Sequence, residues 1–266
     1  MLQERYYDPI ERRLVYCSQR ASPEFWDAHW ERNYFEQAIK GQRNWFIIKI
    51  TRHFLNHGSR VIDGGCGWGD KVYSLNQAGF DAYGVDYTVN TVKLIHQYAP
   101  GLKIFHSDVR ELPFKTDFFD GYWSLGVIEH FYEGYDSIAS EMARVLRPGG
   151  YLFLMFPCMS PLRRLKSRLS SYPNLPGSFD PEKDRFYQFA LNVDTVVDQL
   201  KRLGFHLRFK LRTAGVKGIK DEIPSLKPFL QRLFNSTSLP LKSLRVLLDV
   251  LLSPFGGHGI LLILRK

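Results

Sequence analysis

The sequence lacks an apolar run long enough to cross a membrane. A bilayer-spanning helix needs about 20 consecutive apolar residues, and the longest near match, residues 239–264, is interrupted by Lys242, Arg245 and Asp249. The first residues also lack the apolar core of a secretory signal, because MLQERYYDPIERR is rich in charge. We therefore expect a cytoplasmic protein.

Cysteine is scarce as well. Only Cys17, Cys66 and Cys158 occur in 266 residues, and their odd number and irregular spacing match neither a disulfide framework nor a metal-binding motif. We predict three reduced thiols and no metal site.

What the sequence does contain is typical of an ordered globular protein, with 44% hydrophobic and 24% charged residues. The net charge of +9 is unevenly distributed, because 19 Lys and Arg face 8 Asp and Glu from Cys158 to the end of the sequence. This local excess favours anionic partners, namely phosphorylated substrates, acidic lipid surfaces or nucleic acid. A solvated basic surface would have the same composition, and that alternative stays open.

The middle of the chain alternates short apolar runs with amphipathic stretches. The expected strands are residues 60–63, 82–86, 103–106, 120–124 and 151–156, and the expected helices are residues 71–78, 88–98 and 137–146. A further helix at 193–203 precedes two final strands at 205–211 and 259–264. Such alternation predicts a parallel α/β sheet with helices on both faces.

The flanking parts interrupt this pattern. Residues 1–58 are expected to form a helical cap, with a helix start at Ser22-Pro23, aromatic residues at helical spacing from Phe25 to Tyr34, and a second helix at 45–55. The remaining divisions are a core at 59–157, an insertion or lid at 158–190, and a C-terminal part at 191–266 with a helical insertion at about 215–257.

The most informative motif follows the first strand of the core. It reads Asp63-Gly64-Gly65-Cys66-Gly67-Trp68-Gly69, and its glycines allow the backbone to approach a ligand closely at the start of a helix. The NAD fingerprint G-x-G-x-x-G is not met, because Asp70 stands where its third glycine would be. A Walker A loop is excluded too, since no Gly-Lys-Ser/Thr follows.

Four further elements follow in order. Asp86 ends the second strand, Asp108 lies in SDVRELPF, and FDGY and RVLRPGG come later. Together with the glycine motif, these residues resemble class I S-adenosylmethionine-dependent methyltransferases over about residues 58–156, and most closely the small-molecule subgroup that includes quinone-biosynthesis enzymes. The resemblance implies a Rossmann-like, seven-stranded sheet whose last strand is antiparallel.

The same resemblance implies a set of residues that bind S-adenosylmethionine. In the family, the acid at Asp86 accepts hydrogen bonds from the ribose hydroxyls, the acid at Asp108 accepts from the adenine amine, and the backbone amide at Val109 donates to the adenine ring. Trp68 and Tyr87 line the cofactor or pack in the core. The full expected set is Asp63, Gly65, Cys66, Gly67, Trp68, Asp86, Tyr87, Asp108, Val109 and Ser124.

The acceptor is expected to meet SLGVIEHF, which follows the fourth strand. A histidine side chain can titrate near neutrality, which makes His130 a candidate general base, with Glu129 as a second candidate; a structural role is the alternative for both. The Asn/Asp-Pro-Pro-aromatic motif of nucleobase amino methyltransferases is absent, which disfavours that acceptor class.

Two basic amphipathic segments, residues 160–169 and 240–253, carry leucines at helical spacing. They favour a lipid-like, lipid-linked or glycan acceptor and peripheral contact with an anionic inner membrane surface. The alternative for both segments is that they are helices that pack on the domain and cover it. The aromatic run at residues 186–189 suits either an acceptor pocket or core packing. An RNA-directed methyltransferase and a catalytically silent, cofactor-binding partner subunit are the competing functions.

Overall fold

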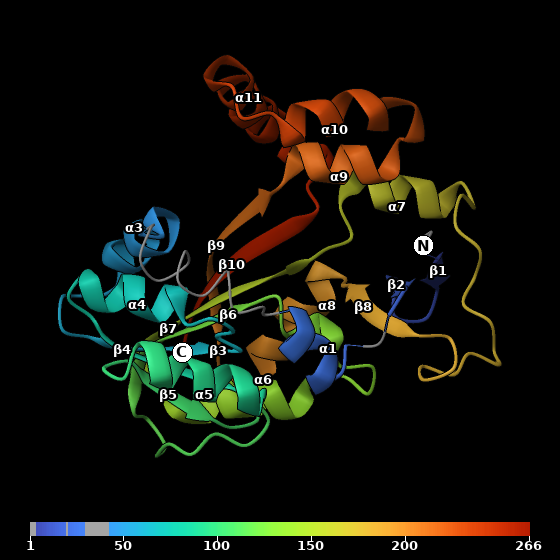
Figure 1. The fold of residues 1–266 in the computed structure, drawn as a ribbon. Coiled ribbons are helices and arrows are strands. Elements are labelled where there is room, and N and C mark those ends of the chain that lie inside the picture. Colours follow the sequence, from blue (N-terminus) through green and yellow to red (C-terminus); the bar gives the residue numbers. More distant parts are fainter. Residues whose placement is uncertain (1–3, 20, 30–42) are drawn as a thin grey trace. The chain divides into compact units, whose positions relative to one another are not determined.

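The computed structural model describes residues 4–19, 21–29 and 43–266 (Figure 1). Its strands are β1 Glu4–Asp8, β2 Arg13–Cys17, β3 Arg60–Gly64, β4 Asp81–Asp86, β5 Lys103–His106, β6 Phe119–Leu125, β7 Leu146–Pro157, β8 Phe186–Ala190, β9 His206–Thr213 and β10 Gly259–Arg265. Its helices are α1 Pro23–His29, α3 Trp45–Phe54, α4 Asp70–Gln77, α5 Val89–Tyr98, α6 Asp136–Val145, α7 Pro161–Arg168, α8 Val193–Arg202, α9 Gly215–Glu222, α10 Lys227–Asn235 and α11 Leu239–Gly256, with short 3-10 turns η1 Ile128–His130 and η2 Pro224–Leu226.

The larger sheet has seven strands in the order β5-β4-β3-β6-β7-β10-β9. Strand β3 runs parallel to β4 and β6, and β4 runs parallel to β5. Strand β10 runs antiparallel to β7. Near the start of β7, the amide of Gly149 donates to the carbonyl of Lys266, which follows β10. Just after the end of β7, the amide of Cys158 donates to the carbonyl of His258, which precedes β10. The seven-stranded sheet with helices around it and antiparallel last strands confirms the predicted fold class.

Most core elements begin and end close to where the sequence predicts them, although β7 begins at Leu146 rather than at residue 151. Strand β5 has the predicted bounds, and α4, α5 and α6 each lie within about one residue of theirs. The reason is local, since β3 carries four buried residues in a row and the helices bury one face each. The RPGG stretch ends α6 as predicted, but its residues already belong to β7.

The prediction of a wholly helical N-terminal segment is wrong. Residues 4–17 form the two antiparallel strands β1 and β2, and β2 also pairs with β8, with Leu14 opposite Ala190. The partner of β2 is therefore more than 170 residues away in the sequence, and no local pattern indicates it. Helices α1 and α3 do form as predicted, with Ser22 capping the first turn of α1. Residues 30–42, including Trp30 and Tyr34, lie outside the described part.

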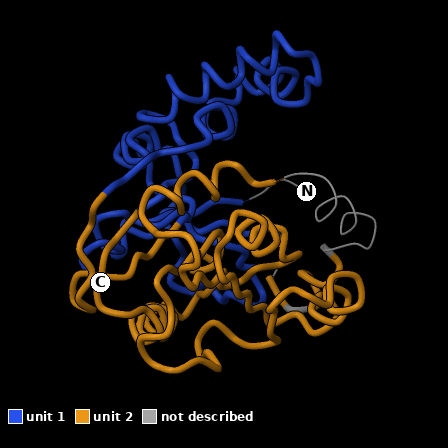
Figure 2. Tube along the Cα trace, turned by 90° about the vertical axis from the view of Figure 1, so that its left-hand side faces the viewer, with its two compact units in different colours: residues 1–19, 155–199, 209–262 blue, residues 20–154, 200–208, 263–266 orange. Residues whose placement is uncertain are grey.

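The chain divides into two compact units (Figure 2). Unit 1 comprises residues 1–19, 155–199 and 209–262, and unit 2 comprises residues 20–154, 200–208 and 263–266. Unit 2 carries the glycine motif and the later acids. Residues 1–19 thus group with the central insertion rather than with α1 and α3.

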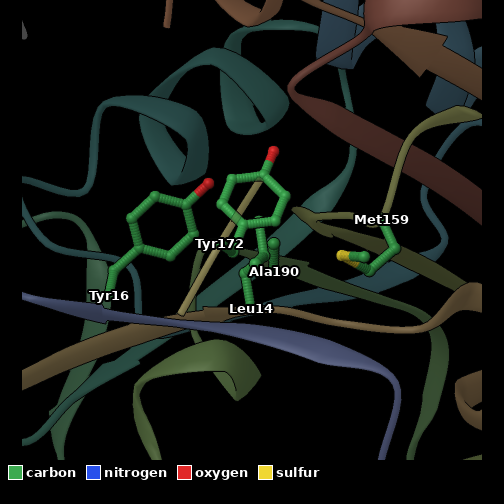
Figure 3. Close-up of a cluster of buried hydrophobic side chains, with 5 residues drawn as sticks. All are labelled: Leu14, Tyr16, Met159, Tyr172 and Ala190. Carbon is green, nitrogen blue, oxygen red and sulfur yellow. The ribbon is translucent and has the colours of Figure 1, made fainter. Parts of the chain in front are cut away.

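Unit 1 has its own small core beside the sheet β1-β2-β8 (Figure 3). The buried cluster consists of Leu14, Tyr16, Met159, Tyr172 and Ala190. The side chains of Phe186 and Phe189 are also buried, so these two aromatic residues of the 186–189 run pack inside the protein.

Two further sequence predictions concern the cysteines and the possibility of a membrane-spanning helix. All three cysteines are free and buried, as expected for reduced thiols. Within residues 4–19, 21–29 and 43–266, no helix combines the length and apolarity that a membrane span requires.

One buried carboxylate connects four segments of unit 1. Glu222, at the end of α9, accepts hydrogen bonds from Arg5 and Arg163 on one oxygen, both at 2.9 Å, and from Lys166 and Tyr172 on the other, at 3.1 and 2.5 Å. The side chains of Glu222 and Arg163 are almost wholly shielded from solvent. Despite burial, which raises it, the pKa of Glu222 is lowered by the arginines and by the tyrosine hydroxyl. The carboxylate is therefore held ionised.

This network predicts a large and local stability effect. Replacing Glu222 with Gln leaves buried cations without their counter-charge, which should lower the free energy of unfolding by about 3–5 kcal/mol. Asp194→Asn is the matched control, because its ion pair with Arg164 is exposed and should contribute less than about 1 kcal/mol. Urea unfolding of both variants measures the difference, and equal losses would contradict the role given to Glu222.

Candidate functional site

The predicted site residues gather where parallel strands of unit 2 end. The register pairs Gly64 at the end of β3 with Ser124 of β6, and Asp86 at the end of β4 with His106 at the end of β5. Because these strands are parallel, their carboxyl ends share one edge of the sheet. Asp63, Asp86, Ser124 and the Asp108 segment, which follows β5, are therefore brought to the same edge.

The glycine motif forms a turn that side chains would obstruct. Gly65, Gly67 and Gly69 adopt φ values of 77°, 48° and 71°, in the left-handed region that favours glycine. A Cβ at Gly65 would lie 2.6 Å from Cγ2 of Val127. The amides of Gly65 and Cys66 both donate to the carbonyl of Val85 at 2.9 Å, so the turn is fastened to the neighbouring strand.

Asp86 has a structural role that the sequence did not reveal. One carboxylate oxygen accepts from the amide of Gly67 at 2.8 Å, and the other accepts from the amide and hydroxyl of Thr88 at 3.0 and 2.6 Å. A carboxylate has about four acceptor positions, so one remains for a further donor. Asp86 thus joins the glycine turn to the start of α5.

Asp63 is buried without any polar partner. Neither of its side-chain oxygens has a hydrogen-bond partner among the described residues, and its side chain has no solvent exposure. Burial, with a smaller contribution from Asp70 and Asp86, raises its pKa to about 7 against the opposing effect of Lys71. An unpaired buried acceptor costs about 1–3 kcal/mol, so donors from a ligand would be favourable here.

Two hydroxyl groups near this edge of the sheet are also buried without a hydrogen-bond partner among the described residues. They are the Ser124 hydroxyl and the Tyr122 hydroxyl, both on β6. The Tyr122 hydroxyl faces Gly64, since any Cβ placed there would overlap it. Tyr122 was not among the predicted residues, because a tyrosine within a buried strand looks like core in the sequence.

Asp108 is already paired. Its carboxylate accepts from the guanidinium of Arg110 at 2.7 to 3.1 Å and from the Arg110 amide at 2.8 Å. Although burial raises it, these bonds bring the pKa of Asp108 below its usual value. The Arg110 side chain is half-exposed, so a ligand donor would compete with a partly solvated ion pair. Val109, beside it, is buried.

The remaining residues of the predicted cofactor set differ in exposure. Cys66 is fully buried, with its sulfur 3.9 Å from the Gly67 carbonyl, and burial raises its pKa. Trp68 is also buried, whereas Tyr87 is 37% exposed. Of the two aromatic residues, Tyr87 is therefore the more accessible to a ligand.

The two candidate bases lie in η1, directly after β6. Glu129 is 2% exposed and its Oε2 has no partner among the described residues. Burial raises its pKa to about 8. His130 packs edge-on against Trp26, with ring centroids 5.1 Å apart.

Helix α1 brings Trp26 to this place. The next residue, Asp27, accepts hydrogen bonds from the side chain of Asn90 at 2.9 Å and from the amide and hydroxyl of Thr91 at 3.3 and 3.1 Å. A carboxylate at the first turn of α5 is also favoured by the helix dipole. The aromatic spacing was the only sequence signal for this contact, and it did not indicate which element α1 would cover.

Comparison with known proteins supports one family. Residues 62–154 match the model of a methyltransferase domain. Demethylmenaquinone methyltransferase of Geobacillus kaustophilus is 30% identical over 46% of this chain and 56% of the relative. Fatty-acid O-methyltransferase of Mycolicibacterium smegmatis is 35% identical over 35% of each chain, and a Bos taurus relative named for tRNA methylation is 36% identical over 39% of this chain and 23% of its own.

The aligned parts span less than two thirds of each of these relatives. Among solved structures, an S-adenosylmethionine-dependent methyltransferase from Mesorhizobium loti superposes with a TM-score of 0.54 over 86% of this chain and 100% of that one, at 17% identity. This likeness concerns the fold alone. The domain match, the fold and the glycine turn together support a class I S-adenosylmethionine-dependent methyltransferase, with residues 62–154 similar to a methyltransferase domain.

Proposed function

We propose that this chain transfers a methyl group from S-adenosylmethionine to a small-molecule or lipid-related acceptor. The observation that carries the proposal is the group of buried acceptors without partners, led by Asp63, beside a turn that glycine keeps free of side chains. A ligand rich in hydrogen-bond donors fits such a site. S-adenosylmethionine offers amino and hydroxyl donors and supplies a methyl group on a positively charged sulfur.

Each residue of the expected set would have a separate task. The backbone at Gly65 and Gly67 would lie against the cofactor, and the remaining acceptor position of Asp86 would receive a ribose hydroxyl. Asp63, which ionises near neutrality, would accept donors from the amino acid part. The amide of Val109 and the carboxylate of Asp108 would hold the adenine, with Cys66, Trp68, Tyr87 and Ser124 as further lining.

We propose Glu129 as the group that takes a proton from the acceptor. Its buried carboxyl has a pKa of about 8 and a free oxygen, so it can exchange a proton close to physiological pH. His130 is the alternative base, and its packing against Trp26 also suits a positioning role.

The proposed acceptor is lipid-like or lipid-linked. Relatives named for menaquinone and fatty-acid methylation support this class, as does the basic excess from Cys158 onward. We also propose cytoplasmic action with peripheral contact at an anionic membrane surface. A glycan acceptor is compatible with the same charge.

RNA methylation is a second candidate, favoured by the relative named for tRNA methylation and by the same basic excess. A partner subunit that binds cofactor without transfer is a third. A radiolabel experiment separates them: the purified chain is incubated with S-adenosyl[methyl-³H]methionine and cell extract, which is then fractionated. We expect label in the organic-solvent lipid fraction. Label in RNA would support the second candidate, and cofactor binding without any labelled product would support the third.

Cofactor binding should depend on Asp86. Asp86→Asn removes the negative charge at similar size, and because hydrogen bonds to charged groups contribute about 1.5–3 kcal/mol, the Kd for S-adenosylmethionine should rise at least about tenfold. The control is Asp81→Asn, which alters a partly exposed acid at the other end of β4 that pairs with Lys103. Calorimetric titration measures both, and an unchanged Kd in Asp86→Asn would contradict the proposed site.

The raised pKa of Glu129 predicts a pH-dependent stability difference. Its pKa is near 4.5 in the unfolded chain and about 8 in the folded protein. The free energy of unfolding therefore falls as the pH rises from the lower of these values through the higher one. Glu129→Gln cannot ionise and should gain about 1–4 kcal/mol relative to wild type between about pH 5 and pH 9. Asp63 is present in both wild type and Glu129→Gln, so its contribution to the pH dependence cancels in the difference between them.

Urea unfolding across this pH range gives the comparison, and parallel stability curves would refute the assignment. If Glu129 is the base, the wild-type transfer rate should also rise through about pH 8, and Glu129→Gln should lose that rise.

A further inference from the structure

Helix α11 is apolar on two sides, although only one of them packs against the protein. On the packed side, Leu248 and Leu252 contact a buried cluster that includes Val216 and Ile219 of α9. The two helices approach closely, because a Cβ at Gly215 would lie 2.5 Å from the Ser253 amide. Figure 1 shows α9, α10 and α11 close together, and all three helices belong to unit 1. The orientation of α11 on α9 is therefore fixed by packing.

The other side of α11 faces solvent. Val246, Leu247, Val250 and Leu251 are 61%, 55%, 67% and 64% exposed, and their spacing places them on one face of the helix. Ser243 and Pro254 extend the same face, so it carries no charge along its length.

Exposed apolar areas of this kind mark interaction surfaces. The exposed charges of α10 and α11 indicate the partner of this face. Lys242 on α11 and Lys227 and Arg232 on α10 are exposed. The only acid of α11, Asp249, accepts a hydrogen bond from the Val216 amide at 2.7 Å and is turned inward.

We propose that the face formed by Val246, Leu247, Val250 and Leu251 docks on the surface of an anionic lipid bilayer, with α11 lying in the membrane plane. An anionic bilayer surface offers an apolar layer that would cover the exposed face and negative charge that would pair with the cations. RNA would match the cations but not the uncharged apolar face. A second copy of the chain would cover the apolar face but bring cations against cations.

This inference extends the peripheral membrane contact of the proposed function by assigning it to one helix face. Flotation with vesicles tests it, using phosphatidylcholine alone or mixed with phosphatidylglycerol. We expect the full chain to float with the mixed vesicles at low salt, less at high salt, and hardly at all with phosphatidylcholine alone. L247Q/L251Q should weaken binding at least about tenfold, and K242Q about fivefold.

The matched control is I10Q/F209Q, which removes two exposed apolar residues of unit 1 outside the helices and should bind like wild type. Failure of wild type to float, or equal loss in the control, would overturn the proposal. Light scattering detects the rival outcome, a dimer that L247Q/L251Q dissociates. Titration with S-adenosylmethionine separates the two proposals: retained cofactor binding without flotation refutes only the docking face, whereas flotation without cofactor binding refutes only the methyltransferase site.

Discussion

The hydrogen bond between the Gly67 amide and Asp86 is the constraint on which the site depends. It holds a left-handed glycine turn against the end of β4, while the bonds from Thr88 fix the start of α5 to the same carboxylate. Since β3 and β4 are parallel neighbours, one acid can set the geometry of two strand-to-helix connections. The ligand role that the family resemblance gives to Asp86 would therefore be added to a structural one.

The acids of the site fall into two groups by their hydrogen bonding. Asp108 has donors, and Arg110 lowers its pKa, whereas Asp63 and Glu129 are buried without side-chain donors and have pKa values raised to about 7 and 8. Burial disfavours the charged form unless partners compensate. The oxygens of these acids that lack a partner are thus costly to the free protein, and this cost is what a donor-rich ligand would relieve.

Unit 1 uses charge differently. Glu222 binds three cations and a tyrosine hydroxyl within unit 1, so two of the cations in the basic C-terminal part, Arg163 and Lys166, have a structural role. Cations on α10 and α11 remain at the surface, and α11 also carries an exposed apolar face. A net charge therefore does not by itself identify a binding surface, because buried and exposed cations contribute equally to it.

The sequence by itself determined the order and bounds of the core elements, the glycine turn and the acids at the strand ends, because these depend on local periodicity and on residues close together in the chain. The roles proposed for the site residues stay predictions. Only the tertiary structure decided that residues 4–8 and 13–17 are strands, since β2 pairs with Ala190 and its neighbours. It also decided that Arg110 forms an ion pair with Asp108. Finally, it decided which face of α11 is exposed: leucine and valine look alike in a helical pattern, and packing against α7, α9 and α10 determines which of them are buried.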